Sequence, residues 1–171
     1  MDKILMFMFA ALLAISLDCC VAETYTANID NFNIQVTSDE PVEFLDLNPP
    51  TSYPDFTAYL VNMWVGDDLF EMIIQDYGSN TSVSKDALVS AIETSYPVPN
   101  ENRESWSYTD VGGQKGIIAY VQPPGSIPQF QIAYSPDAYR NQGTIIVAIT
   151  AFTADEKKVE DVLKTLQISK A

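Results

Sequence analysis

The chain has 171 residues, with 9 Lys or Arg, 23 Asp or Glu, no His and a formal net charge of −14. Its length suits one domain, and a hydrophobic content of 47% allows a sizeable core. The acidic balance argues against binding to nucleic acid and against docking on anionic lipid, since both attract basic surfaces. Without His, the chain also lacks the commonest general base and the commonest metal ligand.

The N-terminal segment is interpreted as a secretory signal peptide. Ile4–Leu17 is uncharged and almost wholly apolar. At about 14 residues it is shorter than the roughly 20 that a bilayer-spanning helix needs, and it fits the apolar region of a signal peptide. The small residues at Cys20 and Ala22 predict cleavage after Ala22. We therefore expect a signal peptide in residues 1–22 and a single α+β domain in residues 23–171.

Two alternatives for this segment stay open. In the first alternative, the segment is an uncleaved membrane anchor. In the second, Cys20 carries a lipid, although Asp18 and Cys19 then occupy positions that usually hold small neutral residues. Cleavage after Ala22 would remove both cysteines and leave neither a disulfide nor a thiol. The expected location is secreted or at the cell surface, with no insertion into the membrane after cleavage.

The first half of the domain is predicted to be rich in strands. Apolar residues alternate from Phe32 to Val36, which indicates a half-buried strand. Ser38–Asp55 contains four prolines and is expected to be a loop. Two segments rich in β-branched and aromatic residues then predict a hairpin of Thr57–Val65 with Leu69–Tyr77, turning at Gly66–Asp68.

A helix is predicted after this hairpin. Ser84 is placed to accept a hydrogen bond from an amide of the first helical turn. Prolines at positions 97 and 99 end the helix. Four apolar residues fall on one face: Ala87, Leu88, Ala91 and Ile92.

More strands follow. Ser105–Val111 and Lys115–Val121 flank Gly112-Gly113, a pair suited to a tight hairpin turn. Gln129–Ser135 alternates apolar and polar residues. Thr144–Phe152 is a continuous apolar run, which is typical of a strand that is covered on both faces.

The C-terminal segment predicts a capped helix and a short final strand at Ile168. Thr153 and Glu156 have the spacing of a capping box. Val159, Val162, Leu163 and Leu166 form a stripe that would face the core. These elements predict an α+β fold: one mainly antiparallel β-sheet with two amphipathic helices packed on it.

The C-terminal stretch GTIIVAITAFTADEKKVEDVLKTLQIS, and the order of elements over Ile29–Ser169, resemble the PsbP-like/Mog1-like superfamily. That resemblance implies a small α/β/α sandwich. It also implies a binding, scaffolding or assembly role with protein partners at the cell envelope, rather than catalysis. The chain departs from the family in lacking a clear aromatic-Pro-Trp turn after the first strand.

No residue set predicts catalysis, a cofactor site or a metal site. A Ser-His-Asp triad needs His and a Cys-His pair needs both Cys and His, and zinc sites usually need one or both. A chain cleaved after Ala22 lacks both residue types. The glycines at 112, 113 and 116 are too few for a phosphate-binding loop. A carboxylate-based hydrolase, or a solute-binding protein, is the alternative to a non-catalytic module.

Two acidic groups invite a calcium interpretation because Ca²⁺ prefers oxygen ligands. Asp67 and Asp68 lie at the predicted hairpin tip, where turn chemistry explains them better. Glu40, Glu43 and Asp46 lie in the proline-rich stretch, where a solvated loop is the preferred explanation.

Several aromatic residues and one sequon complete the candidates. Trp64, in mid-strand, is expected in the core, and Asn80-Thr81-Ser82 is a glycosylation sequon in a predicted surface turn. Four aromatic residues near loops could stack on a partner or a sugar, although packing is the preferred interpretation: Tyr25, Tyr53, Trp106 and Tyr139.

Overall fold

The computed structural model describes residues 21–46, 49–80, 82–136 and 143–170. These residues form two sheets, in which all strand pairs are antiparallel, and two α-helices. The predicted α+β class is therefore confirmed. The predicted signal peptide up to residue 20, including Cys19 and Cys20, lies outside the described residues, as does Tyr139.

The larger sheet has the strand order β3-β5-β6-β10-β9-β8-β7, and β4 pairs with β5 beside β3. Its strands are β3 (Val42–Asp46), β4 (Thr51–Ser52), β5 (Thr57–Val65), β6 (Asp68–Asp76), β7 (Ser107–Val111), β8 (Gln114–Val121), β9 (Gln129–Tyr134) and β10 (Ile145–Phe152).

A second, three-stranded sheet has the order β1-β2-β11. Its strands are β1 (Glu23–Ile29), β2 (Phe32–Ser38) and β11 (Gln167–Lys170). The prediction of a single sheet is therefore wrong. Ile34 of β2 lies opposite Ala27 on one side and Ile168 on the other, so the edges of β2 are used within this sheet.

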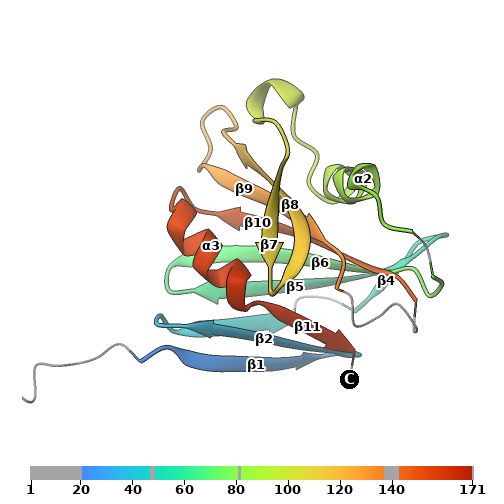
Figure 1. The fold of residues 1–171 in the computed structure, drawn as a ribbon, viewed down its shortest axis with the longest axis horizontal. Helices are drawn as coiled ribbons and strands as arrows, with labels where there is room; N and C mark the ends of the chain where they lie inside the picture. Colours follow the sequence, from blue (N-terminus) through green and yellow to red (C-terminus); the bar gives the residue numbers. More distant parts are fainter. Residues whose placement is uncertain (1–20, 47–48, 81, 137–142, 171) are drawn as a thin grey trace, which may run out of the picture.

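The two sheets and two helices are stacked in layers (Figure 1). Helix α2 (Lys85–Ser95) packs over β8, β9 and β10 on one face of the larger sheet. Helix α3 (Glu156–Thr165) and the smaller sheet cover the other face, and the main core lies between them. Strand β10 lies between both layers and is buried on both faces, which explains its continuous apolar sequence.

The proline-rich stretch is not all loop. Val42 pairs with Val65 and Phe44 with Met63, so Val42–Asp46 is an edge strand of the larger sheet. Pro41 precedes this strand, and its carbonyl oxygen accepts a hydrogen bond from the Gly66 amide at 2.9 Å. The prediction is wrong here because the prolines flank the strand rather than interrupt it.

The structure confirms one of the two predicted helix caps and contradicts the other. The Ser84 side chain accepts from the Ala87 amide at 3.1 Å, which confirms the predicted cap of α2. The capping box predicted for α3 is wrong, because Asp155 is the N-cap and accepts from the Lys158 amide at 3.0 Å. Thr153 is buried and accepts from the Asp155 amide at 3.1 Å, one turn before the helix starts.

The apolar stripe of α3 is buried as predicted, whereas Trp64 is not. Val159 and Leu163 are fully buried in the main core. Trp64 is only half-buried, because strand alternation turns Met63 and Val65 into the core and points Trp64 to the opposite face of β5. Helix α2 lies over β8, β9 and β10 rather than over β5, the strand that carries Trp64.

Candidate functional site

Two lysines stand apart from the other cationic side chains of this acidic protein. Within the part of the chain that the structure describes, each Lys or Arg except Lys85 and Lys115 forms an ion pair with a carboxylate. The paired cations are Arg103, Lys157, Lys158, Lys164 and Lys170.

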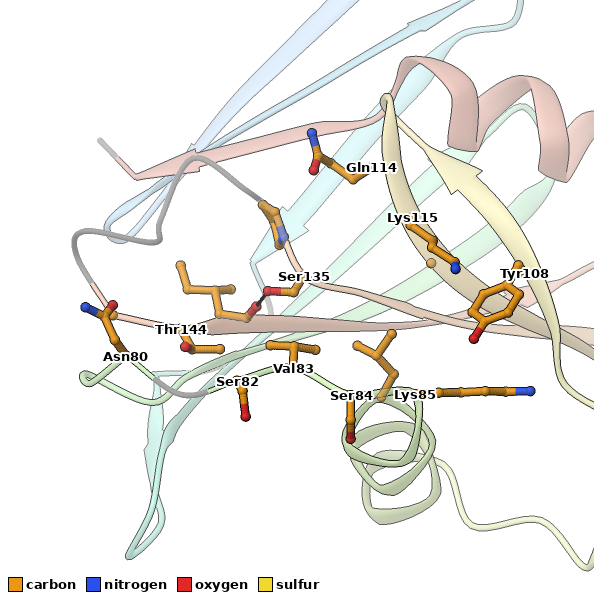
Figure 2. Close-up of a pocket in the computed structure, with 15 residues that line it drawn as sticks. Asn80, Ser82, Val83, Ser84, Lys85, Tyr108, Gln114, Lys115, Ser135 and Thr144 are labelled. Atoms are coloured by element: carbon orange, nitrogen blue, oxygen red, sulfur yellow. Dashed lines mark hydrogen bonds between the residues drawn. The ribbon is translucent and has the colours of Figure 1, made fainter.

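Both unpaired lysines line one surface hollow of about 630 Å³, which we call the lysine hollow. Figure 2 shows it between the N-terminus of α2, the β7–β8 hairpin and the start of β10. Its lining combines polar side chains with a few apolar ones. The polar and aromatic residues of this lining include Asn80, Ser82, Ser84, Lys85, Tyr108, Lys115 and Ser135.

Tyr108 lies between the two lysines. Its side chain is 59% exposed, the Lys115 Nζ lies 3.6 Å from the ring centroid, and the Lys85 Nζ lies 5.4 Å from it. Strand register explains the first contact. Tyr108 is opposite Ile117, and Lys115 is opposite Asp110, so Tyr108 and Lys115 are diagonal neighbours on one face of the hairpin. Both contacts are within cation–π range.

Lys85 reaches the same ring from the first residue of α2. The Ser84 cap fixes the start of the helix, and the Lys85 Nζ donates to the Trp106 carbonyl oxygen at 3.1 Å. Trp106 is itself held, because it packs against the core under α2 and the Arg103 guanidinium lies 4.7 Å from its ring centroid. The positive end of the α2 dipole adds to the positive potential at this side of the hollow.

The carboxylates near the two lysines form no ion pair with them in the described structure. Asp110 lies opposite Lys115 in the hairpin, but its Oδ1 accepts from the Gly113 amide at 3.1 Å. Asp86 follows Lys85 in the sequence and is exposed in the first turn of α2. Neither carboxylate comes within ion-pair distance of Lys85 or Lys115 in the described structure.

The inner wall of the hollow is held by backbone contacts. Gly143 has a φ of 104°, and a Cβ at this position would lie 3.1 Å from the Gly78 carbonyl carbon. The Thr144 amide donates to the Ser79 carbonyl oxygen at 2.8 Å, and Ser135 Oγ donates to the Ile145 carbonyl oxygen at 2.6 Å. The first bond joins the segment after β6 to the residue before β10, and the second joins the residue after β9 to the start of β10.

Two of the acidic residues that invited a calcium interpretation form ion pairs with one lysine. Lys158 Nζ lies 2.8 Å from Glu40 Oε2 and 2.7 Å from Asp68 Oδ2, so one ammonium pairs with an acid from each group. Burial alone would lower the pKa of Lys158, but hydrogen bonds and charges from Asp68 and Glu40 outweigh it and raise that pKa. We call these three residues the Lys158 cluster. It ties the β2–β3 and β5–β6 turns to α3.

Asp67 and Glu43 do not join this cluster. Asp67 is exposed at the hairpin turn, Glu43 is exposed on β3, and Asp46 ends that strand. In residues 21–46, 49–80, 82–136 and 143–170, no three Asp, Glu, Cys or His side chains gather as a metal site would require.

The aromatic candidates and the sequon are dispersed. Tyr25 packs against the main core from β1, and Trp106 packs under α2. Tyr53 is 52% exposed and stacks on Phe56 with ring centroids 4.8 Å apart. Asn80 is exposed and lines the lysine hollow, while Thr81 of the sequon lies outside the described residues.

Sequence reasoning missed Lys85, Tyr108 and Lys115 as a group. Lys85 and Lys115 are thirty positions apart, and no motif joins them. The available signal was the scarcity of basic residues in the chain, which makes any unpaired cation unusual. That signal could not identify these two, because pairing depends on which acids the fold brings near each lysine.

Among the described residues, no helix has the length and apolar character to cross a membrane. No protein-family model matches the chain, and the curated proteins give no match. A solved structure, the solution structure of cyanobacterial PsbP (CyanoP) from Synechocystis sp. PCC 6803, is similar at 14% identity and a TM-score of 0.49. The similarity covers 90% of this chain and 96% of that one. Membership of the PsbP-like/Mog1-like superfamily stays a prediction.

Proposed function

We propose that this protein is an exported, non-catalytic binding module that engages a protein partner at the cell envelope through the lysine hollow. One observation carries the proposal: Lys85 and Lys115, which form no ion pair in the described structure, line the same hollow on either side of an exposed Tyr108.

The side chains of the hollow support binding rather than catalysis. Nucleophilic catalysis requires a hydroxyl or thiol within hydrogen-bond reach of a base. Among the described residues that line the hollow, Ser84 caps α2 and Ser135 donates to a backbone carbonyl, and none of Ser82, Ser84 and Ser135 hydrogen-bonds to Lys85 or Lys115. The described lining also contains no carboxylate, so it offers no pair of acids for glycoside-type hydrolysis.

The exposure of the hollow favours a protein partner over a small molecule. Small-molecule sites usually bury most of the ligand among apolar and aromatic side chains. Here Ser82, Ser84, Lys85, Tyr108 and Lys115 are all exposed to solvent. An exposed tyrosine beside charged groups is suited to the surface of another protein.

Export is the part of this proposal that concerns the N-terminus. Cleavage after Ala22 would leave a chain that starts at Glu23, the first residue of β1, and would therefore leave the described fold intact. Mass spectrometry of the natural protein should find a terminus at Glu23. A lipid-modified terminus at Cys20 would support the anchored alternative, and an intact Met1 on most molecules would contradict export.

Photo-crosslinking tests the binding surface. A photo-reactive amino acid at position 108 should give one discrete protein adduct in the cell envelope of the source cells. The matched control carries the same group at position 53, where Tyr53 is similarly exposed but lies outside the hollow. The same adducts from both positions, or no adduct from position 108, would contradict the proposal.

A further inference from the structure

We infer that the lysine hollow recognises an acidic segment of the protein partner, with Asp or Glu carboxylates placed between Lys85 and Lys115 beside Tyr108. This inference rests on the proposed function and adds to it the chemical class of the partner's surface.

The lysine hollow is a local exception to the acidic charge of the chain. The whole chain has a net charge of −14, and the other described cations are paired with the protein's own acids. Lys85 and Lys115 lie near one aromatic ring, so their like charges repel each other. An anionic group between them would relieve this repulsion and supply the missing counter-charge.

The lysine hollow also supplies available hydrogen-bond donors. An ammonium has three N–H donors and no acceptor. Lys85 donates to the Trp106 carbonyl oxygen, which leaves two of its donors available. Lys115 Nζ lies over the Tyr108 ring and forms no hydrogen bond or ion pair with another described residue. Ser84 Oγ accepts from the Ala87 amide, so its hydroxyl hydrogen remains available to donate. A carboxylate, which only accepts hydrogen bonds, complements this set.

The charge distribution of the chain also makes the lysine hollow selective. The acidic surface elsewhere repels an acidic partner, so productive contact requires the partner's carboxylates to meet the lysine hollow. A nucleic acid is disfavoured, because two lysines neutralise few phosphates while the net charge of −14 opposes the rest. The hollow therefore favours a short acidic segment over a long polyanion.

Binding of a labelled hexaglutamate peptide tests this inference, with hexaglutamine as the uncharged control. Fluorescence anisotropy should show that the full chain binds hexaglutamate and not hexaglutamine, and that binding weakens with added salt, because exposed charges are screened. Lys85→Gln/Lys115→Gln should weaken binding at least ~10-fold, a change of about 1.4 kcal/mol.

The matched control is Lys157→Gln/Lys164→Gln. It removes the same charge from two exposed lysines of α3 that are already paired with acids. We expect this variant to bind hexaglutamate like the unmodified chain. Thermal unfolding of both variants checks their folding, and amide NMR shifts on adding hexaglutamate should concentrate at Val83, Lys115 and Gly116, which line the hollow.

Three outcomes would overturn the inference: no binding of hexaglutamate, equal loss in both double variants, or tighter binding of polygalacturonate or free glutamate than of hexaglutamate. Crosslinking at position 108 separates this failure from that of the proposed function. A discrete protein adduct without hexaglutamate binding would leave the binding module standing and remove only its acidic partner surface.

Discussion

Replacing Leu163 with alanine tests whether α3 is an integral part of the domain. Leu163 is 0% exposed and belongs to the main core together with Phe32 and Ile34 of the smaller sheet. A buried Leu→Ala change removes apolar contacts and leaves a cavity, which costs about 2–5 kcal/mol. Domains of this kind have about 5–15 kcal/mol of stability in total, so the loss is a large fraction of it.

The expected change in melting temperature follows from chain length. For domains of 150–250 residues, each kcal/mol lowers the melting temperature by about 2–4 °C. Leu163→Ala should therefore lower it by roughly 4–20 °C, and urea unfolding should show a lower midpoint with an unchanged slope. Lys157→Ala is the matched control on the same helix. Its side chain is 87% exposed, so the expected change is within about 0.5 kcal/mol.

The competing idea is that α3 is a detachable arm whose apolar face is reserved for a partner. The structure places β11 directly after α3 and pairs it with β2, so removing this segment also exposes an edge of the smaller sheet. A loss below about 1 kcal/mol for Leu163→Ala would refute the core assignment. So would cooperative unfolding of a chain truncated before Thr153.

Three further predictions concern stability. Asp155→Ala should lower the free energy of unfolding, measured in urea, by about 0.5–2 kcal/mol, because it removes the N-cap of α3. An unchanged free energy would show that Asp155 does not cap this helix. Gly112→Ala should lower the free energy of unfolding by at least ~1 kcal/mol more than Gly113→Ala. Both glycines have positive φ, but only at Gly112 would a Cβ meet the backbone at the end of α3. Equal losses of stability in the two variants would contradict this packing. Lys158→Met should lower the free energy of unfolding by about 1–3 kcal/mol at neutral pH. This range lies between the losses expected for breaking an exposed ion pair and a buried one. Because the folded pKa of Lys158 is raised above 10.5, its contribution is present below pH 10.5 and is lost as pH rises through the raised value. The difference between the unmodified chain and Lys158→Met should therefore shrink in strongly alkaline buffer, and a difference that persists there would count against the ion pairs.

Part of the fold was predictable because its signals are local. Alternation in Phe32–Val36, the Gly112-Gly113 turn and the Ser84 cap each act within a few residues, and the structure confirms all three. The stripe of α3 and the continuous apolar run of β10 also predicted their burial correctly. In each case, backbone geometry or helical and strand periodicity relates the sequence directly to the structure.

The remaining features depend on contacts between segments far apart in the chain. Val42–Asp46 is a strand because β5 offers it an edge, and β2 lies in a separate sheet because β1 and β11 pair with it. Trp64 is half-buried because α2 lies over other strands. None of these partners can be inferred from local periodicity.

The sequence by itself determined the acidic balance, the lack of His, most strands and both helices. Only the tertiary structure decided which charges are neutralised. Lys158 pairs with Glu40 from a distant turn, whereas Lys85 and Lys115 meet at Tyr108 without a carboxylate partner in the described structure. The physical reason is that ion pairing acts over a few ångströms, and chain position does not determine which side chains come that close.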